Sequence, residues 1–92
     1  MLHQKDAKAL SNRLKRIEGQ LRGIINMVEK DRTCEEILVQ ISSAKAALHK
    51  TGQVILEGHL QNCFFDNIKN GADEQDEIRK LAKVIEQFSR II

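Results

Sequence analysis

The chain has 92 residues, no proline or tryptophan, only three phenylalanines, and a net charge of +2 with 30% charged side chains. Helix-forming residues dominate and little strand or loop material is present, so we expect an all-α fold in one small domain spanning residues 1–92. No apolar run approaches the roughly 18 to 20 residues of a membrane span, and the N-terminus lacks the order of a signal peptide. The expected location is therefore the cytoplasm, without membrane contact, where two cysteines are more often reactive, metal-bound or buried than disulfide-linked.

The first predicted helix, residues 6–29, is amphipathic and carries most of the positive charge. Residues 1–23 have a net charge of +4, whereas the remaining residues sum to −2. Such segregation is typical of phosphate contacts, and the candidates are Arg13, Lys15 and Arg16, with Lys50 on the next helix. A charged face that is merely solvated is the alternative that stays open. Apolar residues recur on this helix at three- and four-residue steps: Leu10, Leu14, Ile17, Leu21, Ile24, Ile25 and Val28.

The second predicted helix runs from residue 34 to about residue 67. Thr33 stands three residues before Glu36, which is a capping-box signature, so Cys34 takes the first helical position. The middle of the helix, residues 42–47, is rich in small side chains that allow two backbones to approach closely. We therefore expect two copies of this helix to cross there in antiparallel orientation.

Three candidate metal ligands stand at the two ends of this second helix. Cys34 lies about 37 Å from His59 at 1.5 Å per residue, so the two side chains cannot meet within one chain. His59 and Cys63 are four residues apart and share a helix face, where a thiolate and an imidazole suit a soft metal ion. An antiparallel copy would bring its own Cys34 beside them, and twofold symmetry would create two equal sites. Cysteines that are simply buried are the alternative.

A third predicted helix, residues 73–92, follows a loop at residues 69–72 whose glycine suits a left-handed cap. Its acidic start suits the positive end of the helix dipole. Its apolar positions are Ile78, Leu81, Ile85, Phe88 and Ile92. We expect a three-helix protomer and an antiparallel homodimer that forms a four-helix bundle. The sequence has no glycine-rich phosphate motif, cleft-building loops or nucleophile–base pair, so we do not expect an enzyme.

Four segments carry a likeness to known proteins: NRLKRIEGQ at 12–20, DRTC at 31–34, QISS at 40–43 and GHLQNC at 58–63. Together they resemble the CsoR/RcnR family of bacterial metal-sensing repressors, over nearly the whole chain. The resemblance implies an all-helical dimer that pairs into a homotetramer, a dimer of dimers. It also implies a regulator that binds operator DNA when metal-free and releases it on binding its inducer.

The resemblance assigns a metal centre. Cys34 of one protomer, with His59 and Cys63 of the other, is similar to the trigonal Cu(I) ligand set of the copper-sensing branch. Two thiolates and one imidazole suit that soft ion.

The resemblance also assigns residues outside the metal centre. Arg13 and Lys50 fall where family members hold operator DNA, with Lys15 and Arg16 as helpers on the first helix. Glu74 is similar to an outer-shell carboxylate that links the ligand histidine to the DNA-binding conformation.

Other inducers stay open, because copper sensors typically have tyrosine where this chain has Thr33. His3 resembles the N-terminal histidine of nickel and cobalt sensors, so His3, Cys34, His59 and Cys63 would form a four-coordinate Ni(II) site. Cys34 and Cys63 also have the separation seen in the persulfide-sensing branch, which joins two cysteines through sulfur bridges and needs no metal cofactor. Outside the family, a purely structural helical interaction module would bind neither metal nor operator.

Overall fold

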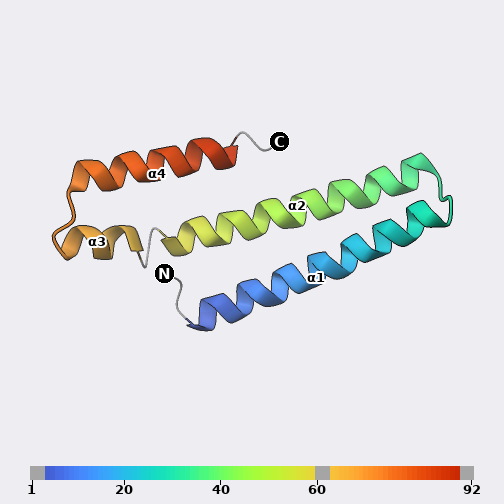
Figure 1. The fold of residues 1–92 in the computed structure, drawn as a ribbon, viewed down its shortest axis with the longest axis horizontal. Helices are drawn as coiled ribbons and strands as arrows, with labels where there is room; N and C mark the ends of the chain where they lie inside the picture. Colours follow the sequence, from blue (N-terminus) through green and yellow to red (C-terminus); the bar gives the residue numbers. More distant parts are fainter. Residues whose placement is uncertain (1–3, 60–62, 90–92) are drawn as a thin grey trace.

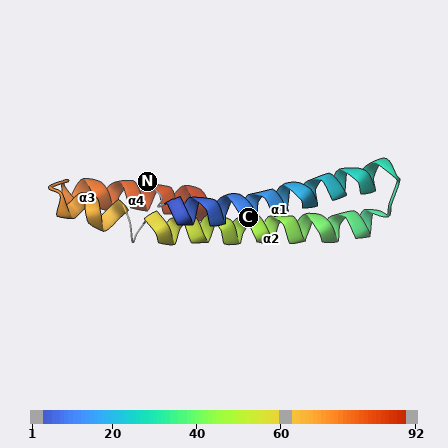
Figure 2. The same ribbon diagram turned by 90° about the horizontal axis from the view of Figure 1, so that it is seen from below.

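The computed structural model is an all-helical protein in which the helices lie in a single layer (Figures 1 and 2). It describes residues 4–59 and 63–89, and within these ranges it contains four helices and no strand. The helices are α1 (Gln4–Glu29), α2 (Cys34–His59), α3 (Phe65–Lys69) and α4 (Glu74–Ser89). The molecule measures 57 × 28 × 13 Å, so its shortest dimension is about the diameter of one helix. The expected all-α fold is confirmed.

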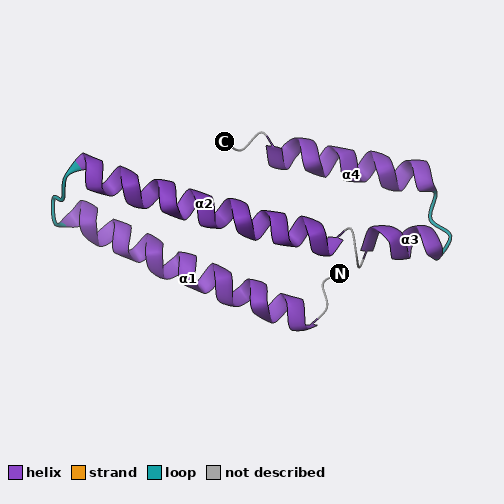
Figure 3. Ribbon diagram, turned by 180° about the vertical axis from the view of Figure 1, so that it is seen from behind, coloured by secondary structure: helices purple, strands orange, loops and turns teal. Residues whose placement is uncertain are grey.

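The long helices α1 and α2 form an antiparallel hairpin, and α4 runs back beside the C-terminal end of α2 (Figure 3). The short helix α3 lies beyond that end and leads into α4 (Figure 1). Within the described part of the chain, no helix combines the length and the apolar content needed to cross a membrane. A layer of this kind has two broad faces, and no further layer of the same chain covers either of them in the described ranges.

The seam between α1 and α2 holds most of the small core. Leu10, Ile17 and Ile24 recur every seven residues on α1 and are only 5, 5 and 9% exposed. Ala44 and Thr51 keep the same interval on α2 and are 4 and 3% exposed. Large residues opposite small ones at this spacing let two helices pack closely and nearly antiparallel. The predicted apolar stripe is wider than the seam, because its other members stay 45 to 58% exposed: Leu14, Leu21, Ile25 and Val28.

In both tight turns, the second residue after the helix adopts the left-handed conformation and closes that helix. After α1 this residue is Asp31, with φ 56°, and after α3 it is Gly71, with φ 98°. In each turn the next N–H donates to a carbonyl five residues back, at 3.0 and 2.9 Å respectively. This Schellman-type pattern satisfies carbonyls that the helix end leaves unpaired. The glycine cap predicted in the loop at residues 69–72 is therefore confirmed.

The start of α2 is capped by the threonine that the sequence indicates. Thr33 Oγ1 accepts a hydrogen bond from the Glu36 N–H at 3.2 Å. The Glu36 carboxylate accepts from Arg32 Nε at 2.8 Å instead of returning to the backbone of Thr33, so half of the capping box forms. Both side chains of this ion pair are exposed, so it stabilises the fold by at most about 1 kcal/mol.

The chain after α2 differs from the prediction of one α-helix from residue 34 to about residue 67. α2 ends at His59, residues 60–62 lie outside the described ranges, and Cys63 and Phe64 form a π turn that leads into α3. The prediction of a continuous α-helix is wrong at this turn, and the described protomer has four helices where three were expected. A π turn widens the backbone and redirects the side chains that follow. Here it accompanies burial of the Phe64 ring, which is 8% exposed and offsets the poorer backbone geometry.

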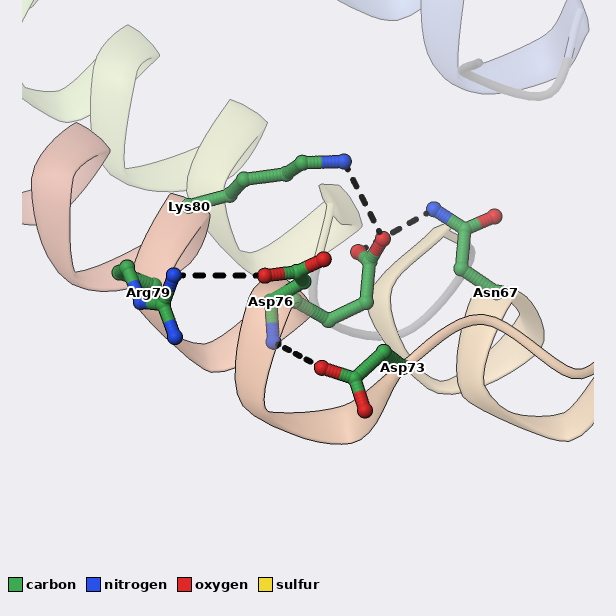
Figure 4. A network of polar contacts seen from close by, with 6 residues as sticks. Asn67, Asp73, Asp76, Arg79 and Lys80 are labelled. Carbon is green, nitrogen blue, oxygen red and sulfur yellow. Dashed lines mark hydrogen bonds and ion pairs between the residues drawn. The ribbon is translucent and has the colours of Figure 1, made fainter.

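The N-terminal end of α4 is fixed by a polar network (Figure 4). Asp73 Oδ2 accepts from the Asp76 N–H at 3.1 Å and so caps the helix, which begins one residue later than predicted. Glu77 is only 7% exposed. Its carboxylate accepts from Asn67 Nδ2 at 3.3 Å and lies 3.7 Å from Lys80 Nζ. These contacts tie α3 to the first turns of α4.

The C-terminal end of α4 docks on α2 through Phe88. The Phe88 ring stacks on the His49 ring, with centroids 5.0 Å apart and an interplanar angle of 9°. The same ring covers Gly52, where an added Cβ would lie 2.6 Å from the ring Cζ and closer still to Cε1. Only glycine leaves room for the ring in this position.

We expect Gly52→Ala to displace the end of α4, because the Phe88 ring has to move away and overpacking of this kind costs about 1–3 kcal/mol. Gly19→Ala is the matched control, since a Cβ added to Gly19 meets nothing within 4 Å. Replacing that glycine in α1 should stabilise the helix by up to about 1 kcal/mol. Hydrogen exchange of the amides of residues 84–89, with thermal unfolding, measures both effects. Equal protection of these amides in the two variants would contradict the contact.

Candidate metal centre and basic groove

Cys34 is the first residue of α2, and its side chain is exposed. Cys34 takes this position because the preceding residue, Thr33, caps the N-terminal end of the helix. Exposure at a helix end leaves the thiol open to a ligand or to another chain. The N-terminal end of α2, which begins with Cys34, lies at one extreme of the layer, beside the turn from α1 (Figure 1).

The other two predicted ligands belong to the opposite end of α2. His59 is the last residue of this 26-residue helix, so about 37 Å of helix axis separates it from Cys34, as predicted. The His59 side chain lies outside the described part of the structure, and its expected shared face with Cys63 stays a prediction. Cys63 is half-buried at the π turn, beside the buried Phe64. Among the described side chains, no three His, Cys, Asp or Glu residues come together as a metal-binding group.

Two more residues were predicted near the metal centre, His3 as an added ligand and Glu74 as an outer-shell carboxylate. His3 lies outside the described residues. Glu74 is the exposed first residue of α4. Sequence reasoning missed its neighbour Glu77, which is the buried carboxylate that contacts α3. The signal was its position four residues before Leu81, on the apolar side of the helix, where a charged residue needs a partner.

One face of the α1–α2 hairpin carries a small groove beside the seam, which we call the basic groove. Its volume is about 180 Å³. It is lined by Arg13, Arg16, Ile17 and Gln20 of α1 and by Ala47 and Thr51 of α2. Lys50 is exposed and lies three residues after Ala47, which places it on the same side of α2. Three of the four predicted DNA-contacting residues thus share this face.

The opposite face of the hairpin is apolar. Its groove of about 390 Å³ is lined by Leu10, Leu14 and Ile55, and Lys15 and Glu18 lie at the same place. Lys15 is therefore separated from Arg13 and Arg16. The cause is the helical period, because neighbouring residues differ by about 100° in direction and the seam runs between the two faces. The predicted DNA-contacting residues of α1 therefore lie on two faces of the hairpin, with Arg13 and Arg16 on one face and Lys15 on the other.

A row of apolar side chains runs along α2 on this second face. Ile41, Leu48 and Ile55 are 45, 47 and 40% exposed and recur every seven residues. Cys34 stands seven residues before Ile41, so it belongs to the same row. We call these three apolar residues the α2 row. Large aliphatic side chains left this exposed in one line indicate a surface that another chain covers.

The geometry defines a class of protein: small and all-helical, with one thiol at the start of its long second helix, a second thiol just beyond the end of that helix, an uncovered apolar row and a separate basic groove. Comparison with protein families gives the particular family. The model described as "Metal-sensitive transcriptional repressor" matches residues 6–89. The chain belongs to this family, so it is a transcriptional repressor and not an enzyme. The resemblance to the CsoR/RcnR family is confirmed.

Individual relatives agree with this assignment. The chain is 49% identical over 86 residues to the copper-sensing transcriptional repressor CsoR of Bacillus subtilis, covering 94% of this chain and 84% of the relative. It is 37% identical over 89 residues to the copper-sensing transcriptional repressor RicR of Mycobacterium tuberculosis, covering 97% and 88%.

Two solved structures have the same fold. The crystal structure of the copper-sensing repressor CsoR with Cu(I) from Geobacillus thermodenitrificans NG80-2 superposes with a TM-score of 0.88 at 42% identity, covering 95% of this chain and 90% of that one. The nickel-responsive transcriptional regulator InrS gives a TM-score of 0.77 at 33% identity, covering 88% and 90%.

Proposed function

We propose that this repressor responds to copper: it binds operator DNA without metal and releases the DNA when Cu(I) binds between two protomers. The ligands are Cys34 of one protomer and His59 with Cys63 of the other. One observation carries the proposal, namely that Cys34 and His59 stand at opposite ends of a single helix that also bears the exposed α2 row. A ligand set divided in this way is complete only in a dimer.

The α2 row supports an antiparallel dimer and indicates its centre. Its middle residue is Leu48, with Ile41 and Ile55 seven residues away on either side. A twofold axis near Leu48 pairs Ile41 with Ile55 of a second copy and sets Leu48 against itself. The same axis brings residue 34 opposite about residue 62, between the two ligands His59 and Cys63. The burial pattern and the ligand spacing, which are independent, agree on one arrangement.

The donor set favours copper among the family's inducers. Two thiolates and one imidazole form a soft, three-coordinate set that suits Cu(I), which would tie the two protomers together when bound. The relatives named as copper sensors, and the related structure with Cu(I), support this choice. The nickel-responsive relative keeps Ni(II) as the second candidate, with His3 as an added ligand. Persulfide sensing through Cys34 and Cys63 is the third candidate.

Further parts of the proposal concern assembly and location. We propose one domain over residues 1–92 and a homotetramer built from two dimers, because α3 and α4 leave further large apolar side chains exposed: Phe65, Ile78, Val84 and Ile85 are 40 to 61% exposed. Glu74 is proposed as the outer-shell carboxylate, near the start of α4. A cytoplasmic location keeps the thiol ligands reduced.

An experiment with reduced protein under anaerobic conditions tests the inducer. The DNA is the duplex that the metal-free protein selects from a random-sequence pool. Cu(I) should release it at one ion per protomer, and His3→Ala should leave both the Cu(I) affinity and the release unchanged, because three ligands suffice. Release by Ni(II) that depends on His3, or release by a persulfide donor that survives His59→Ala, would instead support the respective alternative.

A further inference from the structure

The basic groove presents hydrogen-bond donors that no other group in the described part of the chain engages. Arg13 and Arg16 take part in none of the ion pairs formed among the described residues. Gln20 is half-buried in the same groove, four residues after Arg16, and its side-chain amide makes no hydrogen bond within the described part of the chain. All three side chains come from one side of α1, at intervals of three and four residues. The groove therefore collects two charged donors and one neutral donor from a single helix.

The floor of the groove adds no donor. Thr51 is 3% exposed, and its hydroxyl donates to the Ala47 carbonyl oxygen at 2.8 Å. The Thr51 hydroxyl proton is therefore already used in a hydrogen bond within α2 and is not available to a ligand. Ala47 and Ile17 supply only apolar walls. The free hydrogen-bond donors that line the groove therefore all come from α1, and Lys50 of α2 lies on the same face outside the lining.

The size and the charge of the groove together select its ligand. About 180 Å³ is well below the roughly 300–1,000 Å³ of sites that take drug-sized molecules. The two guanidinium groups have no acidic partner among the described residues, so they favour an anion. Arginine forms bidentate, charge-assisted hydrogen bonds with phosphate oxygens. One tetrahedral oxyanion fits these requirements.

We propose that the basic groove holds one phosphate group of the DNA backbone, with Arg13 and Arg16 carrying the charge and the Gln20 amide donating the third hydrogen bond. This inference rests on the proposed operator binding and adds Gln20 to the contact surface. It also removes Lys15, which lines the opposite, apolar face. A backbone contact of this kind positions the protein on the duplex and does not read the sequence.

Two substitutions at one position separate charge from hydrogen bonding. Gln20→Ala should weaken binding of metal-free protein to DNA about tenfold, because a donor to a charged group is lost. The slope of log affinity against log salt should not change, since a neutral donor displaces no counterion. Gln20→Glu places a carboxylate beside the two guanidinium groups, so it should weaken binding more and flatten the slope by about one unit.

The controls make the result specific. Lys15→Ala removes one positive charge from the same helix, and it should leave affinity and slope unchanged. Both Gln20 variants should weaken the selected duplex and a random duplex by the same factor. A flattened slope in Lys15→Ala, together with Gln20 variants that bind as the unmodified protein does, would overturn the proposal.

A third arm separates DNA phosphate from free phosphate. Inorganic phosphate should displace DNA no better than chloride at equal ionic strength; stronger displacement that Gln20→Glu abolishes would assign the groove to the free anion and overturn the proposal. All arms use metal-free protein, whereas Cu(I) affinity is measured separately and should be unchanged in both Gln20 variants. Failure of the copper proposal and failure of this one are therefore distinguishable.

Discussion

Replacing Leu48 with glutamate should convert the assembly into monomers that no longer hold DNA. Leu48 is the middle residue of the α2 row and is 47% exposed in the protomer. In the proposed dimer it meets its own copy at the twofold axis, so Leu48→Glu brings two carboxylates together where the partner excludes water. Burying an unpaired charge costs several kcal/mol, and about 4 kcal/mol corresponds to roughly a thousandfold weaker association.

A matched control is available on the same helix. Val39 is 63% exposed and lies nine residues before Leu48, which is half a turn away in direction. Val39→Glu makes the same change of chemistry on the far side of α2, and the dimer should persist. Sedimentation velocity over a range of protein concentrations measures both, and circular dichroism verifies that each variant stays helical. A Leu48→Glu protein that remains dimeric at micromolar concentration would refute the proposed axis.

Mixing two defective subunits should restore metal binding that neither has alone. Cys34→Ala protein lacks one ligand in every site, and His59→Ala/Cys63→Ala protein lacks the other two. A heterodimer of the two has one complete site and one empty site. If equal amounts exchange at random, half of the dimers are mixed, so about one quarter of the normal number of Cu(I) sites should return.

The measurement is Cu(I) stoichiometry by competition with a chromophoric chelator, before and after the two proteins are unfolded and refolded together. Each protein alone, carried through the same cycle, is the control and should stay at the baseline. A mixture that also stays at the baseline would rule out a site shared between chains. Full-affinity binding by Cys34→Ala alone would show that Cys34 is not a ligand.

Much of the local structure follows from the sequence because its causes are local. The Thr33 cap and the Gly71 turn lie within a few residues of the groups that they satisfy. The distance between Cys34 and His59 is fixed by the rise of one uninterrupted helix. The seven-residue spacing that makes Leu48 the centre of the α2 row can likewise be read from the printed residues.

The π turn at Cys63 and Phe64 could not be predicted in the same way. Residues 60–67 contain no proline, and their composition is compatible with a continuing α-helix. The turn accompanies the burial of one aromatic ring, which depends on the position of other helices. The contact between Phe88 and Gly52 could not be predicted either. In the sequence, a glycine within a helix only indicates a locally less stable helix, and the structure is needed to show that the Phe88 ring packs against it.

By itself, the sequence determined that the chain is helical, where the cap of α2 and the glycine turn lie, that Cys34 and His59 stand a helix length apart, and to which family the chain belongs. Only the tertiary structure decided which side of α1 is covered. Helical periodicity defines an apolar stripe and a basic segment, but it does not say where a neighbouring helix divides them. Packing of α2 along Ile17 buries part of the stripe, leaves Leu14 exposed, and sets Arg16 and Lys15 on opposite faces.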